Sequence, residues 1–191
     1  MNGTPKVEDY DLKKLPVTKL DAARRQIETA ICLWFDEGDP VSIHTLIAAA
    51  HGILRDINKK LGGPPMLSEP SQFIRPGKEK EVRRIMRAAA NFFKHANTDP
   101  KGTHFFSARA NEGFLIESCQ VYAELAHERR PLMRLFTHYF KIHEPDLFLP
   151  DPAADPIPDT VLKEIRTLSK RQFFFDLLPS LMRIPTSEGR Q

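Results

Sequence analysis

Three polar side chains recur at intervals of four near the middle of the chain: Arg87, Asn91 and His95. In an α-helix this spacing places side chains one above the other on a single face. Histidine transfers protons near neutral pH, arginine neutralises phosphate charge, and asparagine orients a ligand by hydrogen bonds. With Arg84, which falls on the same stripe, they predict a site that binds a phosphodiester and could cleave it by general acid–base chemistry.

The stripe lies opposite the apolar face of the helix predicted over residues 78–96. That apolar face carries Val82, Met86, Ala89 and Phe93. One interpretation is that the stripe is a water-facing surface without a function. The other is that the helix meets its own copy in a homodimer, because a two-fold contact would bring the same stripe from both chains together into a lined cleft.

Part of the stripe also matches a family motif. An all-helical bundle that carries a polar residue followed by histidine, here Asn91 and His95, resembles the HEPN superfamily. Its members are helical domains, often dimeric, and include RNases of toxin and defence systems. The family motif starts with arginine, where this chain has Ala90, and the nearest arginine is Arg87, a turn earlier.

The resemblance implies a dimer that binds RNA or a nucleotide through Arg84, Arg87, Asn91 and His95, without strong nuclease activity. Residues 39–57 and 91–100 also look like a group of uncharacterised bacterial proteins, a resemblance that implies no function. The expectation is therefore a protein that is not an enzyme of high activity and needs no cofactor.

Two histidines, His44 and His51, suggest a metal site as an alternative. They are seven residues apart on one predicted helix, about 10.5 Å along its axis, so they cannot share an ion without a third ligand such as His95. No HExxH or Cys/His spacing supports one. The leading hypothesis therefore has no metal and expects both histidines to be partly buried with hydrogen-bond partners. A metal-dependent helical enzyme using His44, His51 and His95 stays open. The remaining histidines after the central stripe are scattered and expected to be exposed: His127, His138 and His143.

Composition favours a cytoplasmic protein. The 191 residues are 41% hydrophobic and 28% charged, and the net charge of +3 permits contact with nucleic acid without requiring it. We see no signal peptide and no apolar run of the ~20 residues that a membrane span needs, so no membrane partner is expected. Cys32 and Cys119 lie in apolar helical patterns, which predicts two buried free thiols in a reducing cytosol.

Proline and glycine divide the chain into about six helices. Thr18 with Asp21 resembles a capping box, and Asp39 followed by Pro40 is typical of a helix start. The helices are predicted over residues 18–37, 40–61, 78–96, 111–128 and 131–144, with a last helical unit from about 160.

Three parts follow from this pattern: a flexible arm over 1–16, a helical bundle over 17–145, and a proline-rich tether with a C-terminal hydrophobic helix over 146–191. The long connection before residue 78 is expected to pack through Met66, Phe73 and Ile74. The C-terminal segment RQFFFDLLPSLM is too apolar to stay in water, so it must dock on the body or on a second subunit. A non-enzymatic scaffold protein that uses this segment is the second alternative function.

Overall fold

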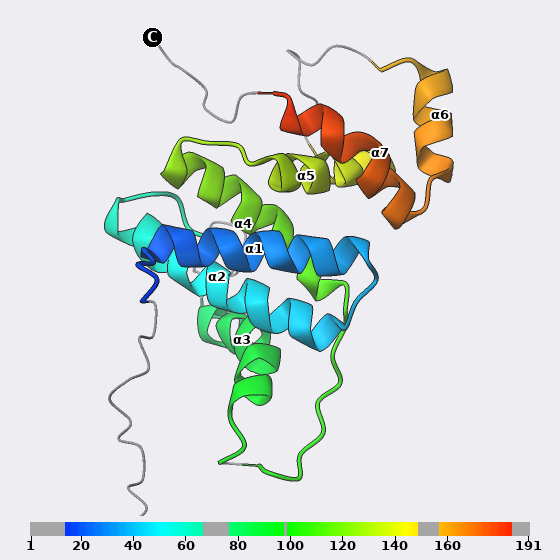
Figure 1. Cartoon of the computed structure of the whole chain (residues 1–191). Helices are drawn as coiled ribbons and strands as arrows, with labels where there is room; N and C mark the ends of the chain where they lie inside the picture. The colour runs from blue at the N-terminus through cyan, green and yellow to red at the C-terminus, as the bar shows by residue number, and fades with distance from the viewer. Residues whose placement is uncertain (1–13, 67–76, 98, 149–156, 185–191) are drawn as a thin grey trace, which may run out of the picture.

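Seven α-helices make up the part of the chain that the computed structural model describes, residues 14–66, 77–97, 99–148 and 157–184, and no strand occurs among them (Figure 1). The all-α prediction is confirmed. The helices are α1 (Lys19–Phe35), α2 (Pro40–Lys60), α3 (Glu79–Lys94), α4 (Ala110–Ala126), α5 (Pro131–His143), α6 (Asp159–Thr167) and α7 (Lys170–Met182), with one 3₁₀ turn at Pro145–Leu147.

The first two helices begin where their sequence signals place them. Thr18 accepts a hydrogen bond from the Asp21 backbone N–H and completes a capping box. The Asp39 carboxylate accepts from the Ser42 N–H at 2.7 Å, with Pro40 at the first helical position. These caps satisfy N–H groups that have no partner inside the helix, and they explain why the predicted starts agree with the observed ones.

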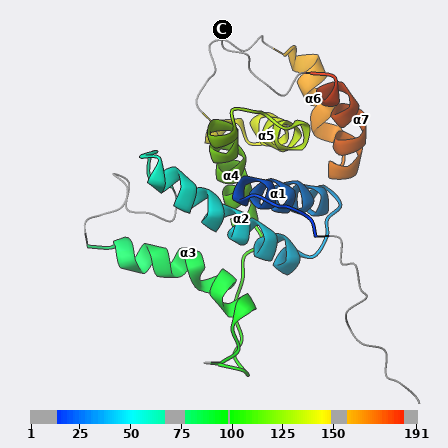
Figure 2. The same cartoon turned by 60° about the vertical axis from the view of Figure 1, so that its left-hand side comes forward.

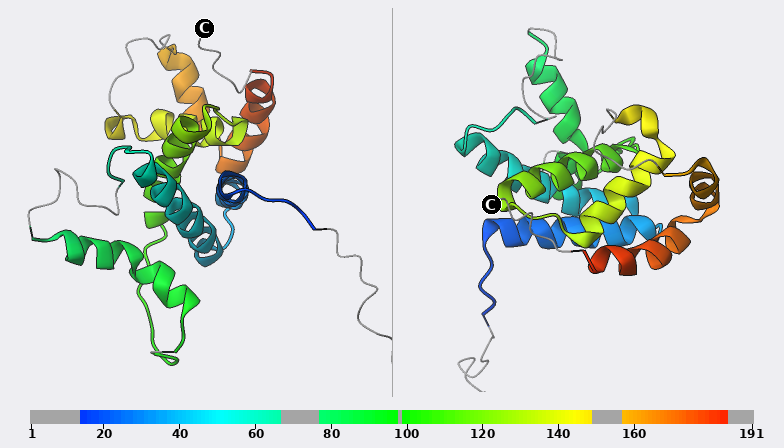
Figure 3. Two further views of the ribbon diagram at one scale, coloured as in Figure 1. Left: turned by 90° about the vertical axis from the view of Figure 1, so that its left-hand side faces the viewer. Right: turned by 90° about the horizontal axis from the view of Figure 1, so that it is seen from above.

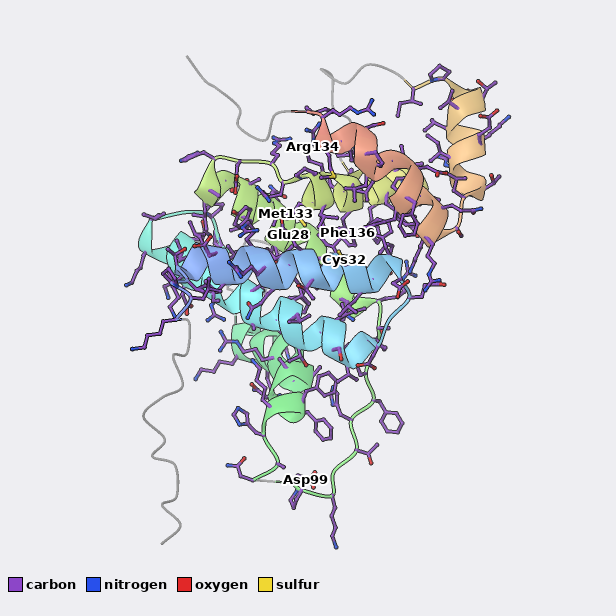
Figure 4. The ribbon with its side chains drawn as sticks, in the orientation of Figure 1. Glu28, Cys32, Asp99, Met133, Arg134 and Phe136 are labelled. Carbon is purple, nitrogen blue, oxygen red and sulfur yellow. The ribbon has the colours of Figure 1, made fainter. Side chains whose placement is uncertain are left out.

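The core lies where α1, α2, α4, α5 and α7 meet. Trp34 contacts the rings of Phe136, Tyr139 and Phe140, each with its centroid within 5.3 Å. The contacts with Phe136 and Tyr139 are edge-on, a geometry that adds to the stabilisation from buried apolar area. Because these rings come from the end of α1 and from α5, they fix the two helices against each other. Figure 4 shows Cys32 and Phe136 at this boundary.

The C-terminal segment is two helices where one unit was predicted. The chain breaks at Leu168 and Ser169, and Ser169 begins α7 with a capping box to Gln172. Phe173 is only 1% exposed and stacks on Phe35 of α1. The segment was predicted to dock on the body of its own chain or on a second subunit, and in the structure it docks on its own chain.

Helix α3 stands apart from the rest (Figure 2). Among the helices it packs on α2, on the side away from α5 and α7. The chain that follows it projects further and then turns back toward α4, as the side view in Figure 3 shows. Asp99 marks the far end of this projection in Figure 4. Residues 79–109 are named here the projecting unit, and its described residues, 79–97 and 99–109, are therefore largely free of the core.

Several expectations about single residues can now be compared with the structure. Cys119 is buried but Cys32 is exposed, so the prediction of two buried thiols is wrong for Cys32. Its position on α1 is beside the apolar stripe and not within it. Met66 is buried at 2% exposure, as expected. Phe73, Ile74, the arm over residues 1–13, the tether over 149–156, and the side chains of Val82 and Met86 lie outside what the structure describes.

Candidate functional site

A shallow concavity of about 310 Å³ lies along α3. The side chains that line it are Lys80, Arg84, Arg87, Ala88 and Asn91. Every charged group in this lining is a cation, and the amide of Asn91 adds both a donor and an acceptor. A concavity with this lining suits an anion with several oxygen atoms, such as a phosphate.

The helix itself brings these residues together. Lys80, Arg84 and Asn91 follow steps of four and seven, which keep side chains on one face over about 16 Å of helix. Arg84 and Asn91 are exposed, and Arg87 is half-buried. The structure thus groups three of the four predicted site residues. Lys80 was missed, although its i, i+4 spacing to Arg84 is a signal that the sequence offers.

His95 is the predicted site residue that does not line the concavity. Helix α3 ends at Lys94, and His95 is the C-cap residue, with an extended backbone (φ −130°, ψ 119°). Its N–H still donates to the Asn91 carbonyl at 3.1 Å, but the side chain has left the helical register. The imidazole is exposed at the end of the stripe, one turn beyond Asn91.

The net positive charge of the protein is concentrated in the projecting unit. Residues 79–109 contain seven lysines and arginines against three aspartates and glutamates, a formal net charge of +4, while the whole chain carries +3. The remaining residues are therefore slightly acidic in sum. An anionic partner would be drawn to this end of the molecule.

Buried histidines lie where the projecting unit joins the bundle. The Asn111 amide donates to the Pro40 carbonyl at 3.0 Å, which leaves its oxygen to accept from His44 Nδ1 at 2.9 Å. This assigns the proton of a neutral His44 to Nδ1 and the lone pair to Nε2, which is buried and has no hydrogen-bond partner among the described residues. Burial lowers the pKa of His44, and the nearby Lys94 and His104 lower it further, against the effect of the Asn111 hydrogen bond.

His51 makes a second buried contact about two turns further along α2. Its Nε2 lies 2.6 Å from a carboxylate oxygen of Glu117 on α4, and its ring packs on Phe114. The predicted hydrogen bonds of His44 and His51 are confirmed, and both side chains are buried more deeply than the partial burial predicted. Their polar atoms join α2 to α4, which is a structural role.

An aromatic cluster holds the end of α3 and the segment after it against the bundle. His44 contacts the rings of Phe93, Phe106 and Phe114, with centroids between 4.9 and 5.7 Å. These rings come from α3, from the returning chain and from α4. The cluster explains how a projecting helix keeps a defined position with few other contacts.

The metal hypothesis finds no support in this geometry. Within the described ranges no three His, Cys, Asp or Glu side chains come close enough to hold an ion. His44 and His51 each use one ring nitrogen in the contacts above, with Asn111 and with Glu117. The expectation of exposure is right for His127 and His138, but His143 is half-buried and stacks on Tyr139 at 4.1 Å.

A second cavity, of about 300 Å³, lies between α1 and α7. Its lining is mainly aromatic and aliphatic and includes Cys32, Leu33 and Phe174. An ion pair between Asp36 and Arg171 lies at its polar side. Nothing in the sequence pattern predicted this cavity, because it depends on how α7 docks.

No family model, curated protein or solved structure matches the chain. None of the helices in the described segments has the length and apolar character to cross a bilayer. The chemistry of the concavity therefore has to be inferred from its own residues.

Proposed function

We propose that the protein is a HEPN-like helical protein that binds RNA or a nucleotide as a dimer, without strong nuclease activity. Arg84, Arg87, Asn91 and His95 form the proposed site, and Lys80 joins them. The observation that carries the proposal is the concavity on α3, because all of its charged lining groups are cations. Arginine and lysine supply the charge that phosphate groups require, and arginine adds paired hydrogen bonds.

Dimer formation is proposed because α3 offers a face that the bundle does not cover. The main contact of α3 with another helix is its packing on α2, and its polar stripe is largely exposed. A two-fold contact along this stripe would turn one shallow concavity into a deeper one with twice the charge. The ligand's phosphates would then offset the repulsion between like-charged residues.

Binding is proposed in preference to turnover because, among the described residues, none is placed as a partner of the His95 imidazole for acid–base chemistry. Its side chain is exposed at the end of α3, and Ala90 occupies the place of the motif arginine. A catalytic histidine is held within hydrogen-bond reach of the proton that it moves. We expect His95 to contribute hydrogen bonding to the ligand.

The experiment is a titration of a fluorescently labelled ten-nucleotide RNA at several salt concentrations. Wild-type protein should bind with an affinity that falls steeply with salt, because phosphate contacts release counterions. Arg84→Gln should weaken binding severalfold and reduce the salt slope by about 1. Arg25→Gln, at an exposed arginine on α1, is the matched control and should change nothing.

His95→Ala adds a separate test of the site's extent. The variant should fold normally, since the imidazole is exposed, and should bind RNA more weakly. Loss of folding in His95→Ala would show that the residue is needed for packing. Wild-type protein that binds neither RNA nor a mononucleotide at low salt would refute the proposed function.

The scaffold alternative is favoured by one observation at α7. Phe175 is 69% exposed and borders the cavity between α1 and α7, so docking of α7 leaves an aromatic side chain for a partner or a second copy. Light scattering of Phe175→Asp tests it. A reduced mass would support contact through α7, and an unchanged mass from a dimeric wild type would count against it.

A further inference from the structure

We infer that the projecting unit also binds bases: Phe105 is a stacking platform for a base of a single-stranded polynucleotide whose phosphates lie on the α3 concavity. The inference rests on the proposed function, because one strand would occupy both places. It goes further by naming the ligand as a single strand with unpaired bases, and by adding residues outside the α3 stripe.

Phe105 is the starting observation. It is 96% exposed, more than any other large hydrophobic side chain in the described part of the chain, where Leu61 at 72% is next. Both faces of its ring are therefore open to solvent. Base–aromatic stacking uses such a face and tolerates any base, since every base has a π surface.

The residues on both sides of Phe105 are held in position although its ring is exposed. Exposure alternates along residues 102–107, so that His104 and Phe106 face the protein while Phe105 faces solvent. His104 stacks on Phe92 with centroids 5.4 Å apart, and Phe106 packs on Phe93 at 5.3 Å. Because both neighbours of Phe105 pack on α3, the backbone at Phe105 loses little conformational freedom when the ring binds a base.

Charge favours a polynucleotide over an apolar protein partner. Lys94 and Lys101 are exposed in the same segment, and the projecting unit as a whole carries a formal net charge of +4. Aromatic side chains combined with a cationic surface are typical of proteins that bind single strands. A protein partner would need a complementary acidic surface around an apolar pocket for one ring.

The spacing indicates a chain of several nucleotides. Arg84 and Phe92 are eight residues apart on α3, about 12 Å along the helix. Phe92 stacks on His104, the residue before Phe105. Successive stacked bases rise by about 3.4 Å, so a nucleotide whose phosphate is held at Arg84 does not place its own base on the aromatic segment. An oligonucleotide can reach both the concavity and the aromatic segment, and a mononucleotide should occupy only the cationic end.

The test compares labelled ten-nucleotide adenine strands of RNA and of DNA, a ten-base-pair duplex, and unlabelled AMP as competitor. Phe105→Ala should weaken both single strands about tenfold, the size expected for one stacked base. The inhibition constant of AMP should stay unchanged, because AMP uses only the cationic end. Phe105→Trp should retain single-strand affinity, and Leu61→Ala, at an exposed hydrophobic side chain at the end of α2, is the control without effect.

Each other outcome is informative. Unchanged single-strand affinity in Phe105→Ala, while Arg84→Gln still weakens binding, would overturn this inference and leave the proposed function standing. Equal affinity for duplex and single strands would also overturn it, as would Phe105→Ala breaking a dimer with no loss of RNA affinity, which would assign the ring to a protein contact. Wild-type protein that binds no polynucleotide would overturn both.

Discussion

The bundle and the projecting unit of this protein are stabilised in different ways. In the bundle, Phe35, Phe136 and Phe173 are almost completely buried, and aromatic rings from α1, α5 and α7 contact one another. In the projecting unit, Phe105 is 96% exposed and Phe92 37%, and the side chains of Lys80, Arg84, Lys94 and Lys101 are exposed. The same residue types thus form a core in one region and an accessible surface in the other. This difference agrees with the roles proposed above, in which the bundle provides stability and the projecting unit binds the ligand.

The largest expected effect is on the bundle side. Phe136→Ala should lower the free energy of unfolding by about 3–5 kcal/mol, because it removes a fully buried ring and leaves a cavity. Phe105→Ala should change it by less than about 0.5 kcal/mol. Denaturant titration of both variants measures the contrast, and equal losses would contradict the division into two regions.

The next effect lies at the junction between the two regions. Asn111→Ala removes the amide that bonds both His44 Nδ1 and the Pro40 carbonyl. Each buried group left without a partner costs about 1–3 kcal/mol, so thermal unfolding should begin well below the wild-type temperature. Asn111→Ala with wild-type stability would show that other groups or water replace the amide.

A smaller effect should appear as the pH falls. The pKa of His44 is lowered by burial in the folded protein, so the unfolded chain takes up the proton first. Stability from this group is complete above the ordinary histidine pKa of about 6.5 and is lost as the pH falls through the lowered folded value. The pKa of the half-buried His143 is lowered in the same direction, chiefly by burial.

The comparison of wild type with His44→Gln isolates the His44 contribution. Denaturant titrations at pH 7.5, 6.0 and 5.0 should show the wild type losing more stability than the variant over this range. Identical pH dependence in the two proteins would mean that His44 takes up its proton equally well folded and unfolded.

The smallest effect on stability is expected at the recognition surface. Arg84→Gln should change the free energy of unfolding by less than about 0.5 kcal/mol, since the side chain is exposed. The same variant should weaken RNA binding severalfold. A variant that unfolds more easily and binds RNA normally would reverse the roles given to the two regions.

Local signals predicted much of the fold. The capping residues Thr18 and Asp39 gave correct helix starts, and apolar spacing gave the buried faces of α1 and α2. Ser169 and Gln172 carry a capping-box signal of the same kind, yet the C-terminal segment was predicted as one helix. Cys32 was wrongly predicted to be buried. It lies beside the apolar stripe of α1, and the sequence does not show how much of α1 the docked α7 covers.

The site was predictable only in part. Arg84, Arg87 and Asn91 share a helical face, a local property that spacing reports. The partners of His44 and His51 lie 67 and 66 residues further along the chain, so local pattern could not name them. The exposure of Phe105 depends on His104 and Phe106 packing inward, which is a tertiary property.

Photo-crosslinking of a labelled single-stranded RNA to the full chain, with the crosslinked residues identified by mass spectrometry, tests the central claim most directly. The proposed division of roles predicts crosslinks within residues 79–109, with Phe105 among them, and fewer of them in Arg84→Gln. Crosslinks confined to α5, α6 and α7, or a yield that Arg84→Gln leaves unchanged, would contradict it.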